Sequence, residues 1–114
     1  MIVECKKDGN LLNIVSENSK HVVNINNLQD FLYNSDYILA RINNGKDDKV
    51  LVINGDGDIC FRLVNDANFY IGYLQVHPRY GNCVVASELI EDKWVDGYYA
   101  YTEGVGFLRK NQTR

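Results

Sequence analysis

Aromatic rings and carboxylates are concentrated between Trp94 and Glu103, in the stretch WVDGYYAYTE, which contains no lysine or arginine. Tryptophan and tyrosine are enriched at binding hot spots, because a large rigid ring buries much area while its polar tip still finds a partner. Carboxylates among such rings suit a basic partner. The stretch therefore predicts a partner-binding surface, to which we assign Trp94, Asp96, Tyr98, Tyr101, Glu103, Glu91 and Asp92.

This region also carries the one marked charge asymmetry of the sequence. Residues 88–103 contain five carboxylates and one lysine, a net charge of −4, whereas the whole chain carries −3. A solubilising surface is the simplest alternative interpretation of these charges. The mildly acidic balance argues against binding nucleic acid through its phosphates, which requires a face of lysine and arginine. We therefore expect a basic protein partner and no direct contact with nucleic acid.

Two histidines offer a different chemistry. His21 and His77 are candidates for the acid–base pair that a metal-independent ribonuclease uses. Near His77 in the sequence stand a cation and a phenol, Arg79 and Tyr80, which are suited to holding a phosphate. The sequence contains no G-x-S-x-G, H-E-x-x-H, Walker or G-x-G-x-x-G pattern. A small His-dependent, nuclease-like enzyme is therefore an alternative, but we favour a protein without catalytic activity.

Metal and cofactor sites are not expected. The segment from Asn54 to Asp58 begins like a calcium loop, but it lacks the glycine and glutamate that an EF-hand places later in the loop. A hairpin whose glycines supply positive φ is the better interpretation. The three cysteines, Cys5, Cys60 and Cys83, fit no zinc spacing and stand next to apolar residues. We therefore expect three reduced, buried thiols in a cytoplasmic protein.

The pattern along the chain predicts antiparallel β-structure. Short apolar or alternating runs are separated by clusters of Gly, Asn and Asp, which is typical of hairpins. At 114 residues the chain has the length of a single domain, residues 1–114. We expect an α+β fold that is predominantly antiparallel β, a sandwich or half-barrel of about seven to nine short strands, with one short helix.

The helix is expected near residues 27–33. Asn26 or Asn27 is a good N-cap, and Leu28, Phe31 and Leu32 follow helical spacing. Residues 83–95 are ambiguous, since the apolar positions fit either a helix or two strands meeting near Glu91 and Asp92. We favour strands, because β-branched residues open this run.

No N-terminal signal peptide is expected, because the first ten residues lack an apolar core, and no apolar run approaches the ~20 residues that a membrane-spanning helix needs. A small, acidic protein with an aromatic and acidic stripe is predicted to neutralise a basic partner by occlusion, like an immunity protein, an antitoxin or a phage inhibitor of a toxin nuclease. A small-ligand-binding β module, with the aromatic residues lining its interior, is the further alternative. A homodimer formed through an exposed edge strand stays open.

Overall fold

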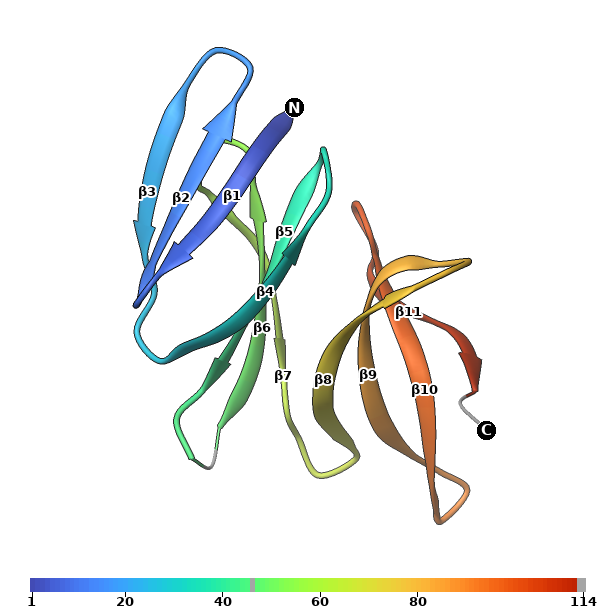
Figure 1. Ribbon diagram of the computed structural model, residues 1–114. Helices are drawn as coiled ribbons and strands as arrows, with labels where there is room; N and C mark the ends of the chain where they lie inside the picture. The colour runs from blue at the N-terminus through green and yellow to red at the C-terminus, as the bar shows by residue number, and fades with distance from the viewer. Residues whose placement is uncertain (46, 113–114) are drawn as a thin grey trace.

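The computed structural model describes residues 1–45 and 47–112 and contains eleven β-strands and no helix within them (Figure 1). The α+β prediction is therefore wrong, and the chain is all-β. The strands are β1 (Ile2–Asp8), β2 (Leu11–Ser16), β3 (Lys20–Asn24), β4 (Leu28–Tyr33), β5 (Tyr37–Asn43), β6 (Asp48–Asn54), β7 (Ile59–Val64), β8 (Phe69–His77), β9 (Gly81–Ile90), β10 (Lys93–Thr102) and β11 (Gly106–Gln112). No membrane-spanning helix is found in these two segments of the chain.

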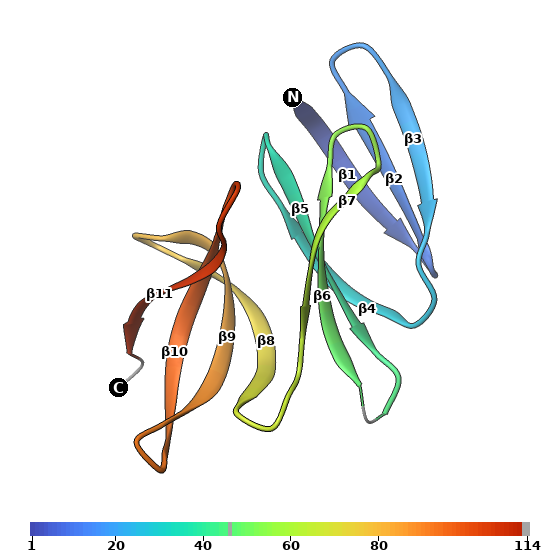
Figure 2. The ribbon, with the colours of Figure 1, turned by 180° about the vertical axis from the view of Figure 1, so that it is seen from behind.

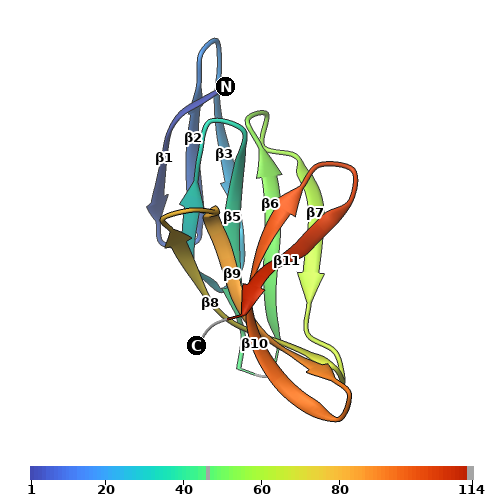
Figure 3. The same cartoon turned by 90° about the vertical axis from the view of Figure 1, so that its right-hand side faces the viewer.

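The described strands form three antiparallel sheets, each made from consecutive strands: a first sheet of β1 to β3, a middle sheet of β4 to β7, and a third sheet of β8 to β11. The first and third sheets lie on opposite sides of the middle sheet (Figures 1 and 2). When the molecule is turned by 90°, the third sheet stands in front of the middle sheet (Figure 3). Three sheets with eleven strands replace the predicted sandwich or half-barrel of about seven to nine strands.

Turns between neighbouring strands contain residues with a left-handed backbone. Gly9 has a φ of 59° between β1 and β2, and Glu91 and Asp92 have φ values of 49° and 63° between β9 and β10. Positive φ at both central residues defines the two-residue hairpin turn whose twist matches that of the strands it joins. The prediction that residues 83–95 form two strands meeting near Glu91 and Asp92 is therefore confirmed. The hairpin around Asn54 to Asp58 is confirmed as well.

The middle sheet is buried on both of its faces. On strand β6, Leu51 and Ile53 face the first sheet, whereas Val50 and Val52 face the third sheet. Successive side chains of a strand point to opposite faces, so a sheet covered on both sides needs apolar residues at every position. This requirement explains the uninterrupted apolar run of β6. The middle sheet separates a first core, on the side of the first sheet, from a second core, on the side of the third sheet.

The predicted helix near residues 27–33 is strand β4 of the middle sheet. Asn27 does not cap a helix but takes a left-handed turn conformation, with a φ of 62°. The register between β4 and β5 shifts between Leu28 and Asp30, which marks a β-bulge. A bulge adds one residue to a strand, so Leu28 and Phe31, three residues apart, both pack on the first core. The apparent helical spacing is thus the spacing of a bulged strand.

Two of the three cysteines are buried as predicted. Cys5 and Cys83 lie in the interior, and burial raises the pKa of both thiols, that of Cys5 to about 11. These two thiols therefore stay protonated and unreactive near neutral pH. Cys60 on β7 is exposed, so the prediction of three buried thiols is wrong for this residue. Its position on the edge strand of the middle sheet explains the exposure.

Candidate partner-binding face

Strand β10 divides its aromatic residues between the two faces of the third sheet. Tyr99 is only 4% exposed and packs edge-to-face on Phe69 in the second core, with ring centroids 5.1 Å apart. Tyr98 points the other way, as alternation along a strand requires. Tyr98 and Tyr99 therefore lie on opposite faces of the third sheet. Trp94 and Asp96 differ from Tyr98 by even numbers of residues and share its outward face.

The strand register places further aromatic residues on this outward face. Ser87 of β9 lies between Tyr70 of β8 and Asp96 of β10, and Val85 lies between Tyr73 and Tyr98 in the same way. Trp94 lies opposite Leu89, at the end of the sheet that carries the β9–β10 turn. We call this surface the aromatic face and define it by Tyr70, Tyr73, Trp94 and Tyr98, with Ser87 and Asp96 between the rings. Tyr70, Tyr73 and Trp94 are each about half exposed, at 54%, 51% and 48%.

A β-bulge at Gly72 brings Tyr70 and Tyr73 to the same side. Residues three apart on a regular strand point to opposite faces. The register of β8 against β9 shifts between Ile71 and Tyr73, so Gly72 is the additional residue. A β-carbon at Gly72 would lie 2.9 Å from the main-chain oxygen of Val85, closer than atoms can pack. Glycine therefore allows the close backbone approach that the bulge requires.

Three of the four rings of the aromatic face, Tyr70, Trp94 and Tyr98, pack against another ring. Tyr70 and Trp94 pack with centroids 5.4 Å apart. At the other end, His77 packs edge-on against Tyr98 and stacks on Tyr80, with both centroid distances 4.5 Å. Such pairs add to the energy of area burial and restrict the rotation of the side chains. These contacts order Tyr70, Trp94 and Tyr98 before a partner binds.

A cluster of polar side chains holds strand β10 in place on the face of the third sheet opposite Asp96. Arg109 donates hydrogen bonds to the Tyr99 hydroxyl and to the main-chain oxygen of Asp96, both at 2.7 Å. The Tyr99 hydroxyl in turn donates to Glu88 at 2.7 Å. Desolvation, and secondly this bond to Glu88, raise the pKa of Tyr99 to about 12, so the phenol stays a donor. A β-carbon at Gly97 would lie 2.8 Å from the Arg109 guanidinium, so glycine makes room for this cation.

The predicted site residues fall into two groups. Glu91 and Asp92, both exposed, form the turn that precedes Trp94, so five of the seven residues lie on or beside the aromatic face. Tyr101 packs between the middle and third sheets, edge-on to Tyr37 at 5.0 Å. Glu103 follows the far end of β10, roughly 30 Å along the strand from Trp94 at about 3.3 Å per residue. The structure does not bring these last two residues to the aromatic face.

Glu103 lies beside a different tyrosine. Desolvation, and then the neighbouring Glu103 carboxylate, raise the pKa of Tyr37 to about 12. Glu103 therefore belongs to the opening between the middle and third sheets, where Tyr37 and Tyr101 meet. This location makes Glu103 a matched control for carboxylates at the aromatic face, because it is also an exposed carboxylate in a turn that flanks β10.

The two histidines are on different sheets. His21 belongs to β3 of the first sheet and His77 to β8 of the third sheet, with the middle sheet between them. The Nδ1 atom of His77 accepts hydrogen bonds from the main-chain N–H groups of Arg79 and Tyr80, at 3.0 and 3.2 Å. His77 thus closes the turn at Pro78, and the two imidazoles do not form the predicted acid–base pair.

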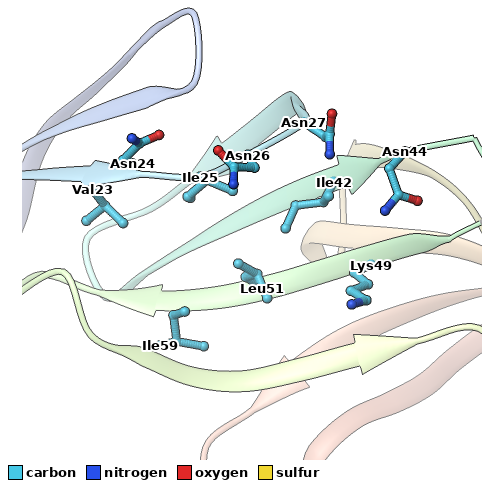
Figure 4. Close-up of a pocket in the computed structure, with 10 residues that line it drawn as sticks. All are labelled: Val23, Asn24, Ile25, Asn26, Asn27, Ile42, Asn44, Lys49, Leu51 and Ile59. Atoms are coloured by element: carbon cyan, nitrogen blue, oxygen red, sulfur yellow. The ribbon is translucent and has the colours of Figure 1, made fainter.

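A separate hollow of about 320 Å³ opens where the β3–β4 connection crosses the end of the middle sheet (Figure 4). Its floor is aliphatic, and Ile42 and Leu51 point toward one another across it. Polar residues also line the hollow: Lys49 and four asparagines, Asn24, Asn26, Asn27 and Asn44. Aromatic residues and carboxylates are absent from the described residues that line it. This hollow suits a small molecule with an aliphatic part and a negatively charged head.

Sequence reasoning did not assign Tyr70 and Tyr73 to the site. The only sequence signal for them is the pair of tyrosines around a glycine within a strand pattern, which suggests a bulge but does not say which face results. No protein family, curated protein or solved structure matches this chain.

Proposed function

We propose that this chain is a small acidic binding protein that neutralises a basic protein partner by occlusion, as an immunity protein, an antitoxin or a phage inhibitor of a nuclease does. The observation that carries the proposal is the aromatic face, where three half-exposed rings, Tyr70, Tyr73 and Trp94, share one side of the sheet with Asp96. Exposed rings of this kind are the residues on which binding energy concentrates at interfaces.

Electrostatics supports a basic partner. Glu91, Asp92 and Asp96 are exposed at the end of the face that holds Trp94, against the single cation of Lys93 in this segment. Opposite charges steer diffusional encounter and set the orientation of the complex, whereas desolvated rings hold the partner once it is bound. A nuclease is the partner class we favour, because its substrate-binding surface must be basic.

The proposal is tested by comparing carboxylates at the two ends of β10. The tagged protein is used to capture proteins from a lysate of its own organism, beside the double variant Trp94→Ala/Asp96→Lys and the control Glu103→Lys. We expect one basic partner that is captured by the wild type and the control but is lost with the double variant. With the purified partner, Asp96→Lys should slow association about tenfold at low salt and flatten its salt dependence, whereas Glu103→Lys should have little effect.

A different result would remove the aromatic face from consideration. Capture of the same partner by the double variant, or equal association rates for Asp96→Lys and the wild type, contradicts the proposal. Equal losses with Asp96→Lys and Glu103→Lys would instead indicate a general charge effect rather than a defined surface.

The asparagine-lined hollow favours a second candidate function, the binding of a small ligand. Its volume of about 320 Å³ is at the lower end of the range for ligand sites. Octanoate is a suitable probe, and we expect amide chemical shifts to move at Ile25, Ile42 and Leu51 below about 10 mM. Lys49→Ala should weaken this binding several-fold, whereas Lys20→Ala, an exposed lysine on β3, should not. Shifts that are absent, or equal for the two variants, count against this function.

A further inference from the structure

A hollow of about 230 Å³ lies within the aromatic face. Tyr73 and Tyr98 form its two walls, Val85 lies between them on the central strand, and Asp96 closes one end. Neighbouring strands are about 4.8 Å apart, so the backbones that carry the two tyrosines are separated by about 10 Å. A single planar group that contacts a ring on each side, at about 3.5–4 Å, fits between them.

The chemistry of the lining groups selects a cation. Aromatic faces attract a cation through the ring quadrupole, and a carboxylate attracts it directly. The Ser87 hydroxyl donates a hydrogen bond to Asp96 Oδ1, which orients the carboxylate and leaves lone pairs of both oxygens free to accept. Asp96 makes no ion pair within the described part of the chain. The nearby Arg109 bonds to its main-chain oxygen instead.

The shape of the hollow distinguishes between the two basic side chains. A guanidinium is flat, stacks on aromatic rings and can bond both oxygens of a carboxylate, whereas an ammonium is a compact, strongly hydrated charge. A hollow flanked by two tyrosines on outer strands and lined by one carboxylate matches the flat group. The other acidic site nearby, the turn of Glu91 and Asp92, carries negative charge but has no aromatic rings on either side to stack on a guanidinium.

We propose that the hollow between Tyr73 and Tyr98 binds one arginine side chain of the partner, with its guanidinium on the Asp96 carboxylate. This assignment rests on the proposed function, because it names the partner group that the aromatic face receives. Tyr70 and Trp94 pack on each other beside the hollow. In the complex, these two rings would contact the partner residues on either side of that arginine.

The test uses three blocked tripeptides as probes, Gly-Arg-Gly, Gly-Lys-Gly and Gly-citrulline-Gly, titrated into the full chain and followed by amide and aromatic NMR shifts. Citrulline has nearly the shape of arginine but no charge. We expect the arginine peptide to shift Tyr73, Val85, Ser87, Asp96 and Tyr98 with a dissociation constant of about 1 mM, which corresponds to roughly 4 kcal/mol. The citrulline peptide should bind at least tenfold more weakly, and the lysine peptide several-fold more weakly.

Two pairs of variants locate the binding. Asp96→Asn keeps the size of the side chain and should weaken the arginine peptide about tenfold, whereas Glu103→Gln should leave it unchanged. Tyr73→Phe keeps the wall and should retain binding, whereas Tyr73→Ala should lose it; an unchanged amide spectrum away from the hollow shows that each variant is folded. No shifts up to about 20 mM, equal binding of citrulline or lysine, or equal binding by Asp96→Asn would each overturn the assignment.

The outcomes separate this assignment from the proposed function. A partner whose capture depends on Trp94 and Asp96, combined with no response to the arginine peptide, overturns the arginine site alone. Arginine binding without any such partner supports the site and contradicts the proposed function.

Discussion

Replacing Ile38 with alanine is expected to lower the free energy of unfolding by about 2–5 kcal/mol. Ile38 is completely buried in the core between the first and middle sheets. Truncation removes apolar contacts and leaves a cavity, because neighbouring strands on a sheet covered on both faces have little freedom to move into it. For a chain of this size the melting temperature should fall by roughly 10 °C or more.

Guanidinium denaturation, followed by both far-UV circular dichroism and Trp94 fluorescence, measures this effect. Trp94 lies in the third sheet and Ile38 faces the first, so a shared loss of stability at both probes shows that the middle sheet couples the two cores. Val22→Ala is the control, because Val22 is also β-branched but is 62% exposed on β3, and it should change stability by no more than about 0.5 kcal/mol. If Trp94 fluorescence in Ile38→Ala gives the same denaturation midpoint as in the wild type, the third sheet unfolds independently of the first core. That result would contradict the prediction of one domain.

Adding a single carbon at Gly72 is expected to disturb the aromatic face as well as the fold. The new β-carbon would meet the Val85 main-chain oxygen at 2.9 Å, so β8 and β9 must move apart or the bulge must shift. Overpacking of this kind costs about 1–3 kcal/mol. A shift of the bulge would also turn Tyr73 away from Tyr98, because a slip of one residue exchanges the two faces of a strand. Gly72→Ala should therefore lose both stability and affinity for the arginine peptide.

Tyr73→Ala separates the two consequences of the Gly72 change. This variant removes one half-exposed ring without touching the bulge, so it should lose the arginine peptide while its stability changes by less than about 1 kcal/mol. The measurements are the denaturation midpoint, the NMR titration and the emission spectrum of Trp94, which packs on Tyr70 of the bulged strand. If Gly72→Ala matches the wild type in all three, the bulge does not set the aromatic face.

The hairpins were predictable because their turns are local. Asp8-Gly9-Asn10, the segment from Asn54 to Asp58, and the pair Glu91-Asp92 each join adjacent strands where turn residues interrupt apolar runs. Alternation along a strand requires Tyr98 and Tyr99 to face opposite sides, but only the packing of Tyr99 in the interior shows which side each takes. The division of the predicted site was not accessible in the same way, since Tyr101 became a core residue only because Tyr37, Phe61 and Phe107 pack against it.

The two bulges show where local patterns fail. At Leu28 and Phe31, and again at Tyr70 and Tyr73, residues three apart share one face of a strand, although the first pair was read as a helix. The sequence by itself determined the antiparallel hairpins, because the conformation of a turn depends on a few neighbouring residues. It also determined the acidic, aromatic character of residues 88–103, which is a matter of composition. Only the tertiary structure decided the three-sheet arrangement and the make-up of the aromatic face. Register is set by contacts between paired strands, as between Gly72 and Val85, and burial by contacts between sheets, as between Tyr37 and Tyr101.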